Sequence, residues 1–132
     1  MDWAPARPYL HCVGDAILEG RNLPALDRAW SDAGELLRDF VELSKQQKSR
    51  PVLLVLPIEH QLKNSYPNVR YQKLILEKAR WLSMETVDLL PTFQKHYIGF
   101  TSLFIPYDGR PNEMAHAIIA EQLLQKLEGN EE

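Results

Sequence analysis

An apolar segment bounded by two prolines, Pro51-Val-Leu-Leu-Val-Leu-Pro57, constrains the fold of this chain more than any other feature. Apolar and polar side chains do not alternate along it, so a strand formed here would be covered on both faces. Strands of that kind are typical of parallel sheets with helices on either side. The segment therefore predicts a central parallel strand, and with it a protein of the α/β class.

The rest of the chain alternates between strand-like and helix-like patterns. The expected elements, in order, are a strand at 9–13, a helix at 27–47, the strand at 51–58, a helix at 68–82, a strand at 85–90 and a helix beginning at Asn112. Asp27 or Ser31 is expected to cap the first helix, and Asn68 the second. This order favours right-handed strand–helix–strand units and a parallel sheet. The long connection 91–110 is expected to be functional or to carry a short helix of its own.

Length and charge exclude several classes of protein. A chain of 132 residues with 45% hydrophobic residues is at most one domain, with residues 1–7 as a lead-in and 128–132 as a frayed tail. A net charge of −3 provides no basic surface for nucleic acid. The longest purely apolar run, Val52–Leu56, is too short to cross a bilayer, and the beginning of the chain lacks a signal-peptide pattern. These features predict a cytoplasmic protein.

Metal and disulfide chemistry are not expected either. Cys12 is the only cysteine, which excludes an internal disulfide and a cysteine-built metal site. The four histidines are scattered without the spacing of metal ligands. We therefore expect no cofactor.

The most specific motif lies near the C-terminus, where Asp108-Gly-Arg-Pro-Asn112 runs into an amphipathic helix. This segment resembles the last block of the SGNH (GDSL-type) hydrolases, in which Asp-Gly-His-Pro-Asn leads into the final helix. Residues 85–91 are similar to the family's last strand, and 51–57 to its penultimate strand. The resemblance covers roughly residues 8–127. It implies one partial SGNH-like domain over 1–132, with a three-layer, flavodoxin-like parallel sheet truncated to about three strands.

The resemblance also assigns residues to catalytic positions. Arg110 occupies the position of the family's catalytic histidine, and Asp108 that of the carboxylate that orients it. Near the N-terminus, Gly14-Asp15-Ala16 can be aligned with the family's first block, with alanine in place of the nucleophilic serine. Alternatively, Cys12-Val13-Gly14-Asp15 matches the third block, with Gly14 where the oxyanion-hole asparagine belongs. Only one helix fits between Asp15 and the strand at 51, so spacing favours the third block. The nucleophile strand would then be absent from this chain.

These substitutions bear directly on the chemistry. Acyl transfer needs a nucleophilic hydroxyl, a base and donors for the developing oxyanion. A guanidinium such as that of Arg110 stays protonated and cannot accept a proton. The resemblance therefore implies an esterase or acyl-hydrolase-like domain that is inactive or incomplete as this isolated chain. The alternatives are a non-catalytic binding or assembly module that kept the fold, or an unrelated α/β module.

Several other residues remain as candidates, each with a structural alternative. His60, beside Glu59 at the end of the central strand, is either half of an acid/base pair or part of a solvated loop. His116 is a substitute base or an ordinary helix residue. Cys12 is a nucleophile or a core cysteine. Arg110 binds a small anion or forms a salt bridge with Asp108. Cys12, Gly14, His60 and Asn112 form the predicted binding set.

The predicted sheet also has a consequence for partners. The strand Tyr9–Val13 would lie at an edge, where unpaired backbone groups can template association. We therefore expect a homodimer or a partner chain at this edge. The expected ligand is a small anionic or ester compound, with no role for nucleic acid or membrane.

Overall fold

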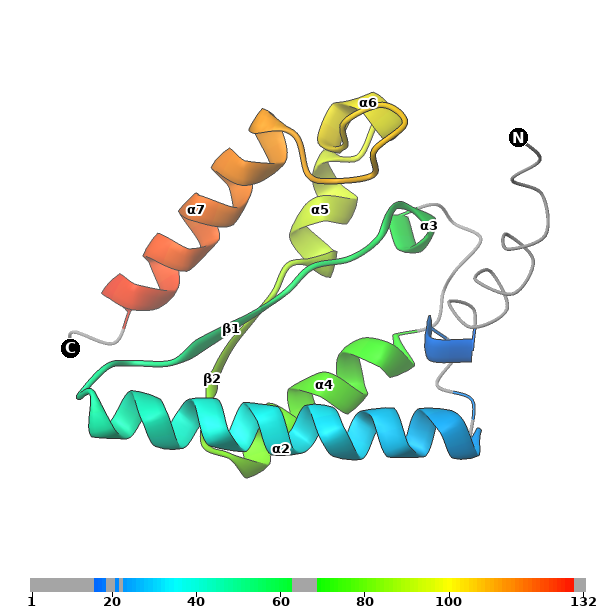
Figure 1. Cartoon of the computed structure of the whole chain (residues 1–132). Coiled ribbons are helices and arrows are strands. Elements are labelled where there is room, and N and C mark those ends of the chain that lie inside the picture. Colours follow the sequence, from blue (N-terminus) through cyan, green and yellow to red (C-terminus); the bar gives the residue numbers. More distant parts are fainter. Residues whose placement is uncertain (1–15, 19–20, 22, 63–68, 130–132) are drawn as a thin grey trace. The chain divides into compact units, whose positions relative to one another are not determined.

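The computed structural model of this chain describes residues 16–18, 21, 23–62 and 69–129. In this part the protein is a mixed α/β structure, mostly helical, with a small parallel sheet (Figure 1). By its contacts the chain divides into two compact units. The first comprises Met1–Pro51 and Asn68–Met84, and the second comprises Val52–Pro67 and Glu85–Glu132. No helix of the described part is both long and apolar enough to cross a membrane.

The first unit contains two long helices, α2 (Pro24–Gln46) and α4 (Arg70–Trp81). Helix α2 begins three residues before the expected Asp27, with Leu23 at the N-cap, so the capping role predicted for Asp27 or Ser31 is wrong. Proline suits the first turn because its missing N–H would have no helical acceptor there. Asp27 lies in that first turn, where its charge complements the helix dipole.

Helix α4 follows Val69, its N-cap, and the predicted cap Asn68 lies outside the described residues. The rings of Trp30 on α2 and Tyr71 on α4 approach with their centroids 6.0 Å apart. Among the apolar residues of the expected helical face, Val41 is buried, whereas Leu36 is 70% exposed. Helical spacing thus identified the helix correctly, but not which of its apolar residues are covered.

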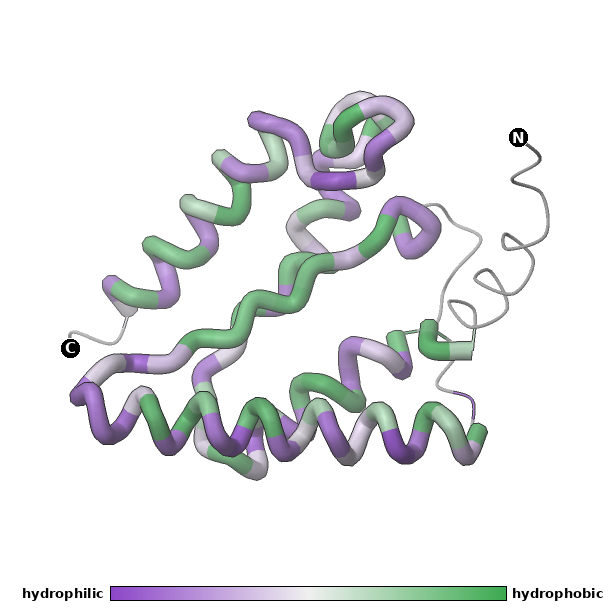
Figure 2. Tube along the Cα trace, viewed as in Figure 1, coloured by the Kyte–Doolittle hydropathy of each residue, from purple (hydrophilic) through white to green (hydrophobic). Residues whose placement is uncertain are grey.

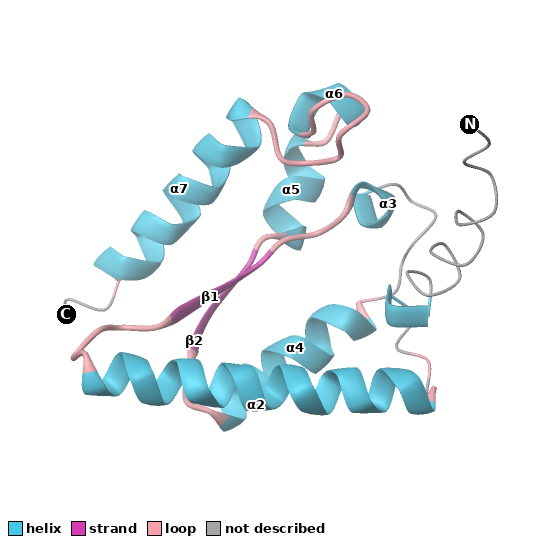
Figure 3. Cartoon of the chain, in the orientation of Figure 1, coloured by secondary structure: helices cyan, strands magenta, loops and turns pink. Residues whose placement is uncertain are grey.

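The second unit contains the sheet, in which β1 (Val52–Val55) pairs in parallel with β2 (Glu85–Asp88). Val52 lies opposite Glu85 and Val55 opposite Asp88, and the strands run side by side in Figure 3. Apolar residues dominate β1, as its colour in Figure 2 shows. Both strands are shorter than the sequence predicts, because Pro57 cannot donate to a ladder and Pro91 lies in the first turn of a helix.

The coarse α/β prediction is confirmed, since helices and a parallel strand pair are both present. The described residues form a sheet of two strands. The third expected strand, Tyr9–Val13, lies outside the described residues.

In the described residues of the second unit, four helices accompany the sheet: α3 (Glu59–Leu62), α5 (Leu90–His96), α6 (Phe100–Leu103) and α7 (Glu113–Glu128). Helix α6 and all of α5 except its first residue lie within the connection 91–110, which confirms that it carries short helices. Asn112 is the N-cap of α7, as predicted, and its side chain accepts a hydrogen bond from the Ala115 N–H.

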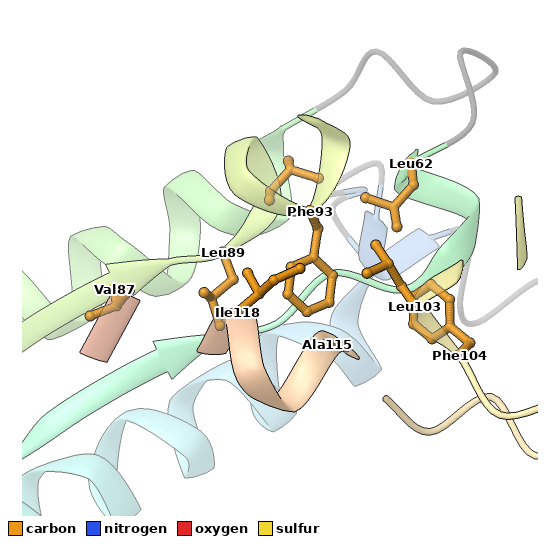
Figure 4. Packing of buried hydrophobic residues seen from close by; sticks show 9 residues of the cluster. Leu62, Val87, Leu89, Phe93, Leu103, Phe104, Ala115 and Ile118 are labelled. Carbon is orange, nitrogen blue, oxygen red and sulfur yellow. The ribbon is translucent and has the colours of Figure 1, made fainter. Parts of the chain in front are cut away.

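The hydrophobic core of the second unit lies between the strands and these helices. Phe93 of α5 is fully buried at its centre, among residues from β2, α6 and α7 (Figure 4). Ala115 and Ile118 are three residues apart on α7 and therefore face this cluster together. The cluster consists of Leu62, Val87, Leu89, Leu90, Phe93, Leu103, Phe104, Ala115 and Ile118. This packing holds the segments that follow both strands, where the candidate site lies.

Candidate functional site

The carboxyl ends of β1 and β2 lead into α3 and α5, and parallel sheets place their functional groups at such ends. Glu59 and His60 are the first two residues of α3, immediately after the β1 segment. Asp88 ends β2, and its Oδ1 accepts a hydrogen bond from the Leu90 N–H at 3.1 Å. The Asp88 side chain thus forms a local hydrogen bond with the backbone at the start of α5.

Glu59 is joined to a residue that the sequence did not single out. The Tyr97 hydroxyl donates a hydrogen bond of 2.6 Å to Glu59 Oε1. This bond, then burial, then the negative charge of Glu59 raise the pKa of Tyr97 to about 12. Each cause favours the protonated phenol, because ionisation would remove the donor and place two negative charges together. The hydrogen bond links Glu59 at the start of α3 to Tyr97, the C-cap of α5. The neighbouring His60 is exposed on α3.

The loop 104–112 carries the motif residues and is closed by backbone hydrogen bonds. The Ile105 N–H donates to Arg110 O at 2.9 Å, and the Asn112 N–H donates to Leu103 O at the same distance. At the tip, the N–H groups of Asp108 and Gly109 both donate to Ile105 O. Gly109 has a φ of 81°, a conformation that glycine adopts without the strain of a side chain. The loop thus holds Asp108 and Arg110 at a defined turn.

Asp108 and Arg110 form a bidentate ion pair in this turn. Arg110 Nε donates to Asp108 Oδ1 at 2.6 Å, and Arg110 Nη2 donates to Oδ2 at 2.8 Å. These hydrogen bonds lower the pKa of the Asp108 carboxyl and raise that of the Arg110 guanidinium. The sequence left open whether Arg110 binds an anion or a carboxylate of its own chain, and the structure has the salt bridge. Both oxygens of Asp108 are therefore occupied by a group that cannot act as a base.

The other predicted positions are distributed over different elements. Asn112 has a structural role, because its Oδ1 caps α7 and its Nδ2 donates to Thr101 O at 3.1 Å. The His116 side chain is exposed on α7, and within the described part it has no hydrogen bond or ion pair. Cys12, Gly14 and Asp15 lie outside the described residues, so their predicted roles stay predictions.

A pocket of about 640 Å³ lies between the α5–α6 segment and the start of α7. His96, Thr101, Ser102, Asn112 and Glu113 supply polar groups to its lining, and apolar side chains supply the rest. The sequence analysis did not select His96, Ser102 or Glu113 as candidates. No local pattern marks them, because the pocket brings together residues from separate elements.

Among the described residues, no group of three or more His, Cys, Asp or Glu side chains could hold a metal ion. Family models, curated proteins and solved structures yielded no match to this chain.

Proposed function

We propose that this chain is an SGNH-type, esterase-like domain, with the family's three-layer flavodoxin-like sheet in part, that does not hydrolyse esters. The bidentate pair of Asp108 and Arg110 is the observation that carries this proposal. In an active hydrolase of this type, the aspartate would orient a histidine that accepts the proton of the nucleophile. Here the same carboxylate holds a permanently charged guanidinium, so the residue at the base position cannot take up a proton.

The pair also argues against the small anionic ligand that the sequence suggested. A guanidinium recognises carboxylate and phosphate through its planar, paired N–H groups. In Arg110 two of these groups already contact Asp108, whose charge cancels that of Arg110. An anion would have only the remaining N–H groups of Arg110 and would meet the negative charge of Asp108 beside them.

Ester hydrolysis by the purified chain tests the catalytic part of the proposal. With p-nitrophenyl acetate and p-nitrophenyl butyrate, we expect release of p-nitrophenol no faster than in a control with an equal concentration of an unrelated protein that lacks esterase activity. The variant Arg110→His restores a titratable base beside Asp108 but supplies no nucleophile, so it should remain equally slow. A wild-type rate well above the control, lost on denaturation, would contradict the proposal.

The fold is tested separately by hydrogen exchange at the strands. If β1 lies inside a larger parallel sheet, its amides that point away from β2 are hydrogen-bonded and should exchange slowly. Exchange of these amides as fast as in an exposed loop would rule out the three-layer sheet while leaving the assay result unaffected.

A non-catalytic assembly module is the second candidate, and the sheet supplies the observation in its favour. Within the described residues β1 pairs with β2 alone, so each strand presents an edge whose backbone groups can join another chain. The homodimer predicted at Tyr9–Val13 would use such an edge. Light scattering during size-exclusion chromatography should then give twice the monomer mass of 15.3 kDa. A monomer at every concentration tested would remove this candidate.

A further inference from the structure

The pocket beside α7 has a chemical character that differs from that of the Asp108–Arg110 turn, and neither of those residues lines it. The apolar part of its lining consists of Ile98, from the α5–α6 segment, and of Met114 and Ala117, from α7. Ile98 is 92% exposed and Met114 is 58% exposed, so both side chains offer apolar surface to a ligand. Burial of that surface would favour a ligand with an apolar body.

Hydrogen bonds hold the two sides of the pocket in place. The Asn112 side chain joins them, because its Nδ2 donates to Thr101 O of α6 and its Oδ1 accepts from the Ala115 N–H of α7. Ser102 fixes the turn before α6 by accepting from the Ile98 N–H at 3.3 Å. A pocket formed in advance requires little ordering when a ligand enters.

Apart from the second N–H of the Asn112 side chain, the polar groups of the pocket lining are predominantly acceptors. His96 Nδ1 lies 2.9 Å from Thr92 O, and a carbonyl oxygen can only accept, so Nδ1 carries the hydrogen and, in the neutral imidazole, Nε2 keeps a lone pair. The Ser102 hydroxyl donates its hydrogen to Gly99 O, which leaves its oxygen only as an acceptor. Glu113 adds a carboxylate. The Thr101 hydroxyl can donate or accept and does not change this balance. The matching ligand group is therefore a hydrogen-bond donor.

Charge decides between a neutral and a cationic donor. Within the described part of the chain, the Glu113 carboxylate has no hydrogen bond or ion pair with another side chain. The amino-terminal end of α7 contributes roughly half a positive charge, less than the full negative charge of Glu113. The net local charge is negative, which favours a cation over a neutral group and over an anion.

We propose that this pocket binds a small amphipathic amine, a primary alkylammonium or arylalkylammonium compound. Its apolar body packs against Ile98, Met114 and Ala117. Its ammonium group donates to the Glu113 carboxylate and to His96 Nε2. The site does not depend on the proposed hydrolase relationship, since none of the residues that supply these contacts belongs to the SGNH motif.

Three ligands of matched size test this site in the full chain: 2-phenylethylamine, 2-phenylethanol and 3-phenylpropionate. Each is titrated into the millimolar range while amide chemical shifts are followed by NMR. The amine should produce saturable shifts at Ile98, Ser102 and Glu113 to Ala117, the alcohol weaker ones and the carboxylate none. Equal responses to amine and carboxylate, or amine shifts elsewhere only, would overturn the proposal.

Variants of α7 provide the matched comparison. Glu113→Gln should weaken amine binding about tenfold, because a charge-assisted hydrogen bond becomes a neutral one. Glu121→Gln makes the same change in charge on the exposed face of α7, away from the pocket, and should bind the amine as the wild type does. Ala117→Leu places a larger side chain in the pocket and should abolish binding. Leucine is also a good helix former, so α7 should be retained.

Circular dichroism of each variant confirms that α7 is retained, so that a loss of binding is not a loss of folding. Unchanged amine affinity in both Glu113→Gln and Ala117→Leu would show that the pocket is not the binding site.

Discussion

Arg110 shows how one side chain limits what a site can do. Its guanidinium stays charged at any physiological pH and matches the geometry of a carboxylate, so it takes both oxygens of Asp108. The lowered pKa of Asp108 means that the pair contributes to stability above the ordinary pKa of an aspartate. This contribution is lost as pH falls through the lowered value. Both side chains are substantially solvated, which keeps the contribution small.

Tyr97 provides a pH-dependent prediction at the same scale. Its pKa of about 12 in the folded protein exceeds the usual value of 10.0, so its bond to Glu59 stabilises the fold fully below pH 10. That stabilisation is lost as pH rises through 12. In an absorbance titration at 295 nm, Tyr97 should ionise last, and a Tyr97→Phe variant should lack this final step.

Glu59→Gln is the matched variant for this titration. It keeps an oxygen that can accept from the Tyr97 hydroxyl but removes the negative charge that opposes ionisation. The final step should therefore move toward pH 10. An unchanged titration in Glu59→Gln would show that the negative charge of Glu59 does not contribute to the raised pKa.

Helix α7 depends both on local hydrogen bonding at its start and on tertiary packing along one face. Its start depends on Asn112, whose side chain caps the helix locally, and its orientation depends on the buried face of Ala115 and Ile118. The same helix carries Leu124, which is 54% exposed, so equally apolar residues on α7 differ in burial.

Two substitutions on α7 separate packing from helix formation. Ile118→Ala deletes a side chain that is 5% exposed within the core cluster, and it should lower the free energy of unfolding by about 2–5 kcal/mol. Leu124→Ala makes a comparable change at an exposed position and should cost about 1 kcal/mol or less. Urea unfolding followed by circular dichroism measures both. Equal losses would mean that Ile118 is not part of the core.

At the scale of the whole molecule, the chain divides into two compact units. The sequence predicts a single domain, and this stays a prediction. The hydrophobic cluster of the second unit is built from the β1–α3 and β2–α7 portions of the chain. All three tryptophans fall within the residue ranges of the first unit. Tryptophan fluorescence therefore reports on the first unit, whereas the total helical signal reports on the helices of both units.

This arrangement predicts how the Ile118→Ala variant unfolds. Its helical signal should begin to fall at a lower urea concentration than the tryptophan fluorescence changes, because the substitution weakens the second unit alone. Replacing the exposed Trp81 by phenylalanine removes a solvated fluorophore and leaves the signal to Trp3 and to Trp30, which lies beside Tyr71. Coincident transitions by both probes would instead indicate one cooperative domain.

Local chemistry explains which sequence-based predictions succeeded. Asn112 caps α7 through a bond to a residue three positions away, and the strand at β1 follows from an uninterrupted apolar run. The start of α2 was misplaced because Asp27 resembles a cap, whereas Pro24 already fits the first turn. The SGNH resemblance predicted that Asp108 and Arg110 occupy catalytic positions. Because the two residues are close in sequence, a salt bridge between them was one of two possibilities for Arg110, the other being the binding of an anion.

The sequence by itself thus determined the positions of the main helices and of two strands, and the exclusion of a proton acceptor at Arg110. These properties depend on side chains within a few residues of one another or on the chemistry of one group. Only the tertiary structure decided that Glu59 pairs with Tyr97, 38 residues away, and that His96, Ser102 and Glu113 line one pocket. Such contacts depend on how helices pack around Phe93, and that packing is a property of the assembled core rather than of any single segment.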